Sequence, residues 1–404
     1  MDKIALNSFL KFGWFINYSN SRIDFDKLKA DKSKYKGFNT QELCKIGVSK
    51  LKKAIVSRFD SRKENVVPIS GGLDSRAILA GLLECTEGKN IHTYTFGTPG
   101  SWDYDIGCQI ANKLGTRHRT FPLTEHKYHL DDLLDVSRRV DHQTLLFHHP
   151  PIRKLEEFYE NYQLWSGFMG DPLAGSHLGT KAYSDLDEAK KNFIKENLFV
   201  RSVKMDYLSN REYFPYIKLF TPQKGDISIK EQLDFNNRQR KYIAPHVLMK
   251  GFNYVLPFLD DDWATFLLSI DNELRYKQKL HKQILLQAFP KVFNYPTKTT
   301  AGLPLDTNDL FIFISKASNR LKQTLFKGSI NKNINYINFN EGIRRRKDLN
   351  SVIKDSIMDL KNRKLIDWID IEKIYKRHMD KQGNYYDALL VLSSLEINLK
   401  AKGK

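Results

Sequence analysis

The sequence predicts an α/β protein with a parallel sheet, followed by a mostly α-helical C-terminal part. Three observations predict this class. Short apolar runs alternate with helical patterns between residues 40 and 140, a glycine-rich turn follows the first run, and the periodicity beyond residue 180 is mainly helical. Strands that alternate with helices form a parallel sheet with right-handed crossovers, and such a sheet binds ligands at the carboxyl ends of its strands.

The first elements surround the glycine-rich turn. Apolar residues at helical spacing predict a helix that starts at Thr40 and gives way at Ser61. The apolar run at residues 66–69 then predicts a strand, although Pro68 within it is typical of an edge strand or a strand start. The turn at residues 70–75 joins this strand to an amphipathic helix, so the turn lies at a carboxyl end of the sheet.

The next elements continue the alternation. A second strand is predicted at residues 91–96 and a third at residues 118–123. Between them, Asp103 can cap a helix that Gly115 ends, because carboxylates favour helix N-caps and glycine favours the position after the last turn. Two further elements are predicted, a helix at residues 130–140 and a strand at residues 163–166.

These patterns divide the chain into three parts. Residues 1–40 are too few for a catalytic domain and form a short leading segment. Residues 41–305 contain the predicted strands and the motifs described below, so they are the predicted catalytic domain. Residues 306–404 form a helical C-terminal region.

The composition argues against several classes of protein. The chain has 404 residues, 41% of them hydrophobic and 28% charged, which suffices for a core without disulfides or structural metal. Its 3 cysteines show no Cys-x-x-Cys spacing, unlike a zinc ribbon or a thioredoxin-type redox pair. No apolar stretch approaches the roughly 18 residues of a membrane span, and the first residues lack a signal-peptide pattern. We therefore expect a cytoplasmic protein without a membrane partner.

The formal charge of +18 favours polyanionic ligands such as nucleotides, phosphosugars, nucleic acids or an anionic surface, and it does not choose among them. Much of the excess lies in the C-terminal third, for example at residues 344–347. Basic runs of this kind are more typical of solvated helix faces than of a polyanion groove.

The most specific chemical signal is the turn Ser70-Gly71-Gly72-Leu73-Asp74-Ser75. It presents successive backbone N–H groups, a hydroxyl and a helix N-terminus to one point, which suits a phosphate or pyrophosphate. Asp74 adds a carboxylate that bound polyphosphate would repel, so a hard cation such as Mg²⁺ is expected between them. No Gly-x-x-x-x-Gly-Lys-Ser/Thr pattern is present, so this is not a Walker-type loop.

This hexad resembles the pyrophosphate loop of the ATP pyrophosphatases, which split ATP into AMP and pyrophosphate while adenylating a substrate. Five further stretches, in the same order along residues 40–305, resemble the synthetase domain of the asparagine synthetase family. They are Thr95-Phe96-Gly97-Thr98-Pro99-Gly100-Ser101 with Asp103, Ala111-Asn112-Lys113-Leu114-Gly115-Thr116, Ser166-Gly167 with Asp171, Leu256-Pro257-Phe258-Leu259-Asp260, and Lys282 and Lys298 with Gly302 and Pro304. The resemblance implies an adenine-nucleotide alpha-hydrolase-like core, that of the PP-loop ATPases.

The resemblance also implies roles for individual residues, with ATP and Mg²⁺ as cofactors. Asp74 and Asp171 would each ligate Mg²⁺, Phe96 would contact adenine through its backbone, and Gly167 would lie near the nucleotide. Lys282 would lie against the α-phosphate and the acyl-adenylate, and Lys298 would neutralise pyrophosphate, since cations stabilise the charge that develops there. The β- and γ-phosphates would be held by Ser70, Gly71, Gly72 and Ser75. Asp74, Lys282 and Lys298 are thus the expected catalytic residues.

The sequence departs from the family in two places. The family's full-length members begin with a glutaminase domain whose nucleophile is a cysteine at position 2, whereas Asp2 occupies that position here. The nitrogen would then come from ammonia, a separate glutaminase subunit or an amine. In the second loop, Phe168 and Pro172 replace glutamates of the family pattern, including the expected general base toward ammonia. Phe168 and Met169 would better line a pocket for a larger substrate.

Other residues have simpler interpretations. Residues 257–260 are expected to begin a helix that carries Trp263 and its neighbours into the core. Asp103 could contact a ribose, but helix capping is the favoured role. His148, His149 and His177 show no metal-ligand spacing and are expected to be surface or pocket histidines rather than zinc ligands.

Three functional hypotheses follow. The leading one is an ATP-dependent amide-forming ligase that adenylates a small-molecule carboxylate and transfers the acyl group to an amine or ammonia. The second is a tRNA-modifying PP-loop ATPase, although the motifs at 256–260 and 298–304 argue against a nucleic-acid partner. The third is a catalytically lapsed nucleotide-binding subunit, which the altered second loop favours and the retained charged residues oppose.

Overall fold

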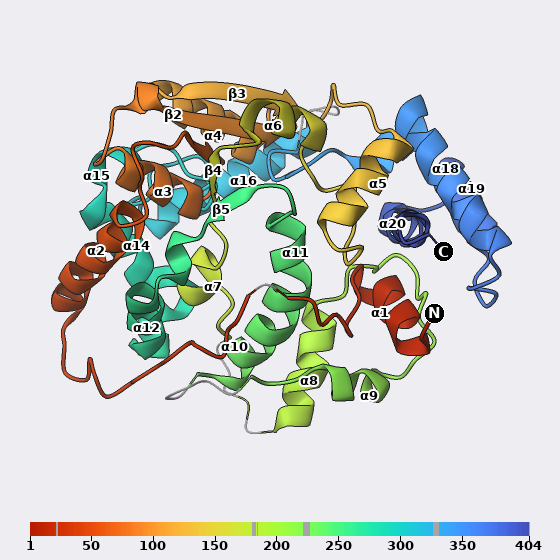
Figure 1. The fold of residues 1–404 in the computed structure, drawn as a ribbon, viewed down its shortest axis with the longest axis horizontal. Coiled ribbons are helices and arrows are strands. Elements are labelled where there is room, and N and C mark those ends of the chain that lie inside the picture. The colour runs from red at the N-terminus through yellow and green to blue at the C-terminus, as the bar shows by residue number, and fades with distance from the viewer. Residues whose placement is uncertain (22, 180–182, 184, 221–226, 326–330, 404) are drawn as a thin grey trace.

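A computed structural model describes residues 1–21, 23–179, 183, 185–220, 227–325 and 331–403. Five parallel strands form one sheet in the order β3-β2-β1-β4-β5, and helices cover both of its faces (Figure 1). The strands are β1 Asn65–Pro68, β2 Ile91–Gly97, β3 Arg117–Pro122, β4 Gln163–Trp165 and β5 Asn253–Val255. The predicted parallel α/β sheet is therefore confirmed.

Strand β1 is the centre of the sheet. Asn65 pairs with Ile91 of β2 on one side and with Gln163 of β4 on the other, both in parallel register. Pro68 is the last residue of this strand, not part of an edge strand, and the following Ile69 donates its N–H to the carbonyl oxygen of Tyr94 at 2.9 Å. The proline thus lies at the end of the backbone hydrogen-bond ladder of β1, and the chain then continues into the glycine loop.

Strand β5 was not predicted. It has three residues, Asn253–Val255, and adds to the sheet beside β4. So short a segment cannot display an alternating pattern, and its position is fixed by pairing with β4 instead of by its own sequence. It extends the row of carboxyl ends by one strand.

The helix boundaries agree with the prediction to within a few residues near the sheet. Helix α2 spans Thr40–Val56 and begins with a capping box in which the Asn39 side chain accepts from Glu42 and the Glu42 side chain accepts from Asn39. It ends before the predicted limit at Ser61. The other helices of this half are α1 Lys3–Phe12, α3 Asp74–Leu82, α4 Trp102–Lys113, α5 Leu130–Arg139, α6 Ile152–Tyr159 and α7 Gly170–Leu173, with a 3₁₀ turn η1 at Gly88–Asn90.

The expected cap of helix α4 was wrong. Ser101 occupies the N-cap, and its side chain accepts from the N–H of Tyr104 at 3.4 Å. Asp103 lies in the first turn instead, where it forms an ion pair described below. The serine stands one residue before the helix, and its short hydroxyl reaches the free N–H groups of the first turn.

Beyond β4 the chain is mainly helical, as predicted, and includes one rare element. Residues Asp234–Ile243 form a π-helix, η3, a conformation that usually occurs as a single turn at a functional site. The remaining helices are α8 Leu186–Glu196, α9 Asn210–Tyr213, α10 Ile229–Leu233, α11 Ala244–Val247, α12 Asp261–Ser269, α13 Asn272–Arg275, α14 Lys279–Ala288, α15 Pro290–Phe293, α16 Asp309–Leu325, α17 Phe339–Arg345, α18 Lys347–Asn362, α19 Ile371–Met379 and α20 Tyr386–Ala401. The 3₁₀ turns of this half are η2 Phe214–Tyr216, η4 Pro257–Leu259 and η5 Tyr276–Gln278.

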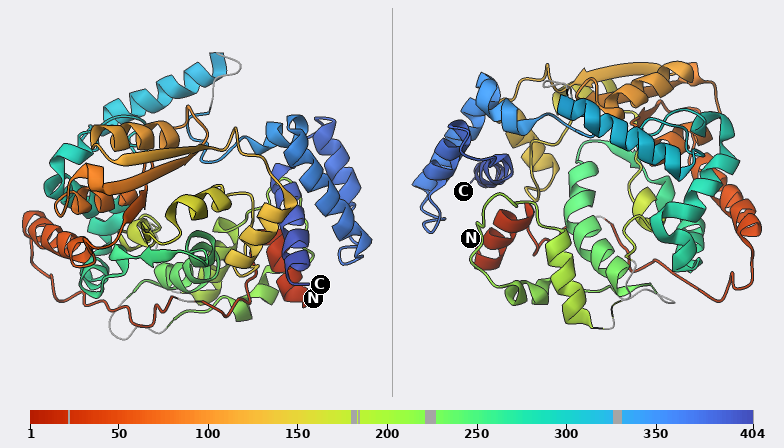
Figure 2. Two further views of the ribbon diagram at one scale, coloured as in Figure 1. Left: turned by 45° about the horizontal axis from the view of Figure 1, so that its top comes forward. Right: turned by 180° about the vertical axis from the view of Figure 1, so that it is seen from behind.

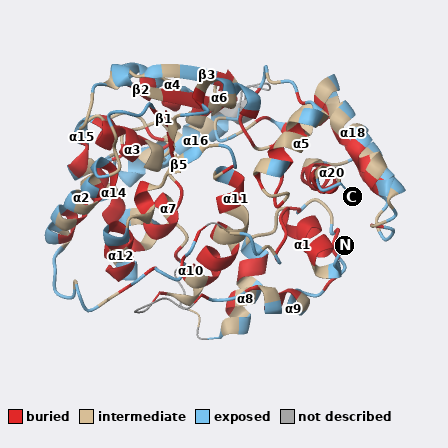
Figure 3. Ribbon diagram, in the orientation of Figure 1, coloured by how far each residue is buried: buried red, intermediate tan, exposed pale blue. Residues whose placement is uncertain are grey.

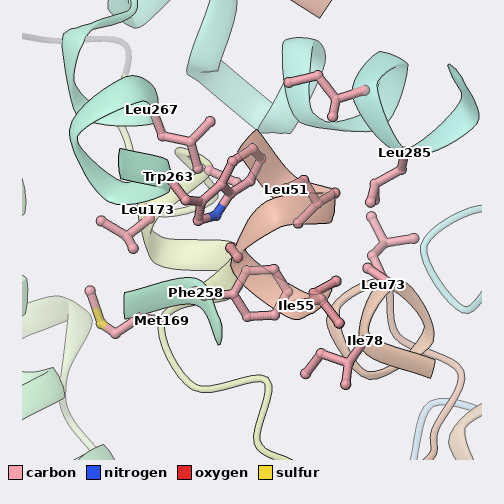
Figure 4. Close-up of a cluster of buried hydrophobic side chains, with 14 of the residues drawn as sticks. Leu51, Ile55, Leu73, Ile78, Met169, Leu173, Phe258, Trp263, Leu267 and Leu285 are labelled. Atoms are coloured by element: carbon pink, nitrogen blue, oxygen red, sulfur yellow. The ribbon is translucent and has the colours of Figure 1, made fainter. Parts of the chain in front are cut away.

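One hydrophobic core lies between the sheet and helices α2, α3, α12 and α14. Figure 4 shows side chains from these elements meeting around Trp263, which is fully buried. As predicted, residues 257–260 lead into the helix that carries Trp263, which is α12. Asp260 caps this helix by accepting a hydrogen bond from the Trp263 N–H at 3.1 Å. This core fixes the helix that follows the glycine loop against the sheet.

A second core covers the opposite face of the sheet. It joins side chains of β1, β2 and β4 to those of α1, α5, α18 and α20. Helix α20 is almost wholly buried among its neighbours, and the two chain termini lie close together (Figures 2 and 3). The segments predicted as residues 1–40 and 306–404 therefore share a core, while the domain boundaries stay a prediction.

No helix among the described residues is both long enough and apolar enough to cross a membrane. Helix α16 lies on the outside of the molecule (Figure 2), and its side chains Leu310, Phe311 and Phe313 are each more than 60% exposed.

Two leucine substitutions test the importance of the first core. Leu267→Ala removes a side chain with 0% exposure, and we expect the free energy of unfolding to fall by about 2–5 kcal/mol. Leu321→Ala is the matched control, because Leu321 is 60% exposed and its truncation opens no cavity. Denaturant titration followed by circular dichroism measures both values. Equal effects of the two substitutions would contradict the assignment of Leu267 to the core.

Candidate active site

The glycine loop connects β1 to α3 and is held by its own serines. The Ser70 N–H donates to Ser75 Oγ at 3.4 Å, and the Gly72 N–H donates to Ser70 Oγ at 3.2 Å. Helix α3 has no side-chain cap at its N-cap residue, Leu73. Its first N–H groups are therefore not occupied by a capping side chain, and together with the loop they form a positive concavity that suits an anion.

Asp74 and Asp171 lie side by side at the adjacent ends of β1 and β4. The Asp171 N–H donates to Oδ2 of Asp74 at 3.1 Å, so the two residues predicted as metal ligands are in direct contact. Gly170 makes this approach possible, because a Cβ atom at that position would lie 2.4 Å from Cγ of Asp74. Gly167 packs closely on the same side chain, since a Cβ atom at Gly167 would lie 3.0 Å from the Cβ of Asp74.

The turn before Asp171 has an unusual backbone. Met169 has φ +69°, in the left-handed region that non-glycine residues rarely adopt, and it is the N-cap residue of α7. Its side chain is 1% exposed, so packing in the first core holds the strained residue in place. This turn directs the N–H of Asp171 toward Asp74.

The surroundings of Asp171 raise the pKa of its carboxyl group above the usual value, first through loss of solvent and then through the negative charge of Asp74. Ser176 Oγ donates to Oδ2 of Asp171 at 3.0 Å. His177 lies 3.7 Å from the same oxygen through Nε2, and its Nδ1 is 2.8 Å from Oδ2 of Asp234. His177 is thus a pocket histidine, one of the two environments expected for it.

The two carboxylates fit a hard cation. Oδ1 of Asp74 is buried and has no hydrogen-bond partner within the described part of the chain, and Nε2 of His281 lies 3.8 Å from it, so one oxygen of this carboxylate is left without a hydrogen bond. Among the described residues, no three His, Cys, Asp or Glu side chains are grouped to hold a metal ion. A Mg²⁺ ion at Asp74 and Asp171 would therefore take its other ligands from phosphate oxygens and water, as is usual for this ion.

Lys298 lies directly beside the glycine loop. Its backbone N–H donates to the carbonyl oxygen of Gly71 at 2.9 Å. Its ammonium group donates to the carboxylate of Asp103 and to Oδ1 of Asn335, the latter at 2.5 Å. The side chain is 29% exposed, so the cation stands at the rim of the loop, where a bound polyphosphate would meet it.

A buried arginine ties the Lys298 segment to α3. Arg76 has 0% exposure, and its guanidinium donates to the carbonyl oxygens of Tyr295 at 3.1 Å and Pro296 at 2.6 Å. Burial lowers the pKa of Arg76 to about 10, which still leaves it charged near neutral pH. Residues far apart in sequence are thereby held together at the glycine loop.

Lys282 is placed differently. It is half-buried on α14, where burial lowers its pKa, and its charged neighbours are Asp309, Lys316 and Lys277. No hydrogen bond or ion pair joins it to the glycine loop among the residues that the structure describes. The preceding residue, His281, is 1% exposed and approaches Oδ1 of Asp74 at 3.8 Å through Nε2. The catalytic role of Lys282 stays a prediction.

Phe96 and Gly167 line a cavity of about 340 Å³ at the carboxyl ends of the strands. His148, His149 and His246 line the same cavity together with Tyr336, so we call it the histidine cavity. Its size is typical of small-molecule sites. The sequence had predicted surface or pocket histidines at 148 and 149, but it had not joined them to Phe96 and Gly167.

Asn335 and Tyr336 were missed as residues of the site. They follow α16 in a stretch rich in asparagine and lysine that carries no motif. The stretch crosses back over the end of β2, where the Trp102 N–H donates to the carbonyl oxygen of Lys332 at 2.8 Å. Only the folded chain brings these side chains to Lys298 and to the histidine cavity.

Gly170→Ala tests whether the contact between the two aspartates matters. The added methyl group would displace the Asp74 carboxylate, so we expect Mg²⁺-dependent ATP binding, measured by titration calorimetry, to weaken at least about tenfold. Gly342→Ala on α17 is the control, because its nearest neighbour is the flexible end of Leu349 at 3.2 Å. An unchanged affinity in folded Gly170→Ala protein would contradict the role given to this contact.

Comparison with known proteins identifies the segment that contains the glycine loop. Residues 48–147 match the family model described as asparagine synthase. Glutamine-hydrolyzing asparagine synthetase 2 of Arabidopsis thaliana is 36% identical over 80 residues, which are 18% of this chain and 14% of that protein. Glutamine-hydrolyzing asparagine synthetase 3 of the same plant is 34% identical over 80 residues, with the same two shares of 18% and 14%.

The alignments thus cover 14% of the length of each relative. The family-model match at residues 48–147 includes the glycine loop, β2 with Phe96, and α4 with Asp103. Asp171, Lys282 and Lys298 lie outside it, so their assignment rests on the motifs and on the geometry described above. The chain carries an asparagine synthase family domain at residues 48–147.

Proposed function

We propose that the protein is an ATP-dependent amide-forming ligase that releases AMP and pyrophosphate. One observation carries the proposal: the glycine loop, the paired carboxylates of Asp74 and Asp171, and the ammonium group of Lys298 converge at one edge of the sheet. An anion site, a cation site and a fixed positive charge are together what the loss of pyrophosphate from ATP requires. The asparagine synthase family match at residues 48–147 supports this choice.

The reaction would proceed in two steps. A carboxylate oxygen of the substrate attacks the α-phosphorus of ATP, and the bond from that phosphorus to pyrophosphate breaks. A nitrogen nucleophile then attacks the acyl carbon, the bond to AMP breaks, and the proton of the nitrogen passes to water. The products are an amide, AMP and pyrophosphate.

The chain would bind and orient ATP through the residues described above. Backbone N–H groups and hydroxyls of the glycine loop would hold the β- and γ-phosphates, and Lys298 would neutralise the departing pyrophosphate. The adenine base of ATP would lie against Phe96 and Gly167, and Lys282 would approach the α-phosphate. Mg²⁺ held by Asp74 and Asp171 would supply positive charge between these carboxylates and the phosphates.

The nitrogen substrate would be ammonia or an amine. A separate glutaminase subunit is one source of ammonia, and the matched Arabidopsis proteins are named as glutamine-hydrolyzing enzymes. Phe168 stands where the family pattern has a glutamate base, so proton removal from the nitrogen would not use that position. An amine substrate with its own low pKa would need less help at this step.

Phosphorus NMR tests the proposal. The protein is incubated with ATP, Mg²⁺ and a pooled set of carboxylates, amines and ammonia, and we expect AMP and pyrophosphate to accumulate. Asp74→Asn should abolish both products, because the negative charge that would hold Mg²⁺ is lost. Asp262→Asn is the control, since Asp262 is 55% exposed and pairs with Lys53 on the surface.

Other products would support other hypotheses. ADP and phosphate would contradict the adenylating mechanism. ATP binding without turnover for any pool would favour the catalytically lapsed subunit, and turnover that depends on added tRNA would favour the tRNA-modifying enzyme.

A lysine pair tests the fixed positive charge. Lys298→Met should lower kcat by about 10²–10³-fold, because a cation that stabilises developing charge in a water-poor site contributes several kcal/mol. Lys53→Met, on an exposed surface pair, should leave kcat unchanged. Release of pyrophosphate, followed with a coupled phosphate assay, measures both rates. A Lys298→Met enzyme with full activity would remove Lys298 from the mechanism.

A further inference from the structure

The histidine cavity extends well beyond the residues expected to contact adenine. Phe96 on β2 and Tyr254 on β5 both line it, and β1 and β4 lie between these strands. Three strand intervals of about 4.8 Å place the backbones of β2 and β5 about 14 Å apart. A purine base beside Phe96 would therefore leave the part of the cavity near Tyr254 for another group.

The cavity also lies apart from the phosphate site. Tyr94, Leu164 and Tyr254 belong to the sheet face that is covered by the second core, whereas α3 packs on the other face. Ser70, Gly71 and Lys298 are not among the residues that line it. The cavity approaches the glycine loop at the ends of β1 and β4, where Pro68, Gly167 and Asp171 line it, and we call this end of the cavity the mouth.

The lining of the cavity is nearly free of charge. Asp171 at the mouth is the single Asp, Glu, Lys or Arg that lines it among the described residues. Burial lowers the pKa of His148 to about 3 and that of His149 to about 4, and it holds the pKa of His246 well below its usual value. All three imidazoles are therefore neutral near pH 7.

The polar atoms of the cavity are partly engaged by the protein itself. Nδ1 of His246 is 3.1 Å from Thr144 Oγ1, and Nε2 of His149 is 3.3 Å from the carbonyl oxygen of Leu145. His148 stacks on Tyr336 with ring centroids 4.4 Å apart and planes 2° apart, so the cavity has a flat aromatic wall. The π-helix η3 contributes Ile243 to the lining.

Most of the remaining wall is apolar, and Ser166 and Gln239 add polar groups to it. Phe168, Met169, Met249 and Val247 line the cavity, and the first of these replaces the glutamate of the family pattern. A free amino acid such as aspartate carries two carboxylates besides its ammonium, and no Lys or Arg among the described residues lines the cavity to pair with them. A neutral, flat or apolar group would instead exchange water for matching contacts.

We propose that the histidine cavity binds the uncharged, largely apolar body of an organic substrate of the ligase, with the reacting end of that substrate at the mouth beside Gly167. The proposal rests on the proposed function and adds the class of substrate. Aspartate does not belong to this class, because it is charged throughout. The same body can belong to the acid that is adenylated or to the amine that accepts the acyl group, and the experiment separates these two sources.

Equilibrium binding tests the proposal without requiring turnover. Phenylacetate and 2-phenylethylamine share one apolar body and differ in the reacting end, and aspartate is the charged comparator. Each is titrated by ligand-observed NMR in the presence of saturating Mg²⁺ and α,β-methylene-ATP, which cannot lose pyrophosphate. We expect one of the two phenyl compounds to bind at least about tenfold more tightly than aspartate, and its identity shows which substrate occupies the cavity.

Substitutions place the binding in the cavity. Met249→Trp fills buried space, and Val247→Trp is a second variant with less risk to folding, because Val247 is 37% exposed. Both should weaken binding of the phenyl compound at least tenfold and leave the Kd of the ATP analogue within twofold. Leu321→Trp is the matched control on the exposed face of α16 and should change neither value.

Three results would overturn the proposal. The first is that neither phenyl compound binds more tightly than aspartate. The second is that the phenyl compound binds only when the ATP analogue is left out, and the third is that the tryptophan variants weaken binding of the analogue as much as binding of the phenyl compound. The second and third results would indicate that the adenine base occupies the whole cavity. Failure of the proposed function is seen separately, as phenyl binding in the cavity without acid-dependent formation of AMP.

Discussion

The contact between Asp74 and Asp171 is the constraint on which the rest of the site depends. The negative charges of the two side chains repel each other, and the hydrogen bond from the Asp171 N–H to the Asp74 carboxylate holds the two residues together. Parallel pairing of β1 with β4 sets the distance between their loops, and Gly170 lacks the side chain that would separate the carboxylates. The backbone alone therefore brings the two predicted metal ligands into contact.

The cationic side of the site is built from other parts of the chain. Arg76 holds the segment before Lys298 against α3, and Asp103 and Asn335 fix the ammonium group at the rim of the glycine loop. The histidine cavity lies mainly on the opposite face of the sheet and approaches the loop near Pro68 and Gly167. The glycine loop and the cavity are therefore separated by the sheet and come close at its edge.

The sequence predicted the central part of the fold because that part follows from local patterns. Alternating strands and helices, with a glycine turn after the first strand, specify a parallel sheet with few alternatives. The sequence did not predict the three-residue strand β5, since so short a strand shows no alternation of apolar and polar residues. It also did not predict that Pro68 lies in the central strand, since packing of the whole sheet decides which strands are neighbours. Ser101 instead of Asp103 caps α4 for a similarly local reason, the position of the first helical residue.

For the candidate site, the sequence by itself determined the glycine loop and the two aspartates, because each lies in a motif of adjacent residues. It also singled out Lys298, which the structure places beside that loop. The tertiary structure alone decided that Asn335 and Tyr336 reach the site and that three neutral histidines line one cavity with Phe96. Such contacts join residues far apart in the chain, and the burial that keeps the imidazoles uncharged exists only after the chain has folded.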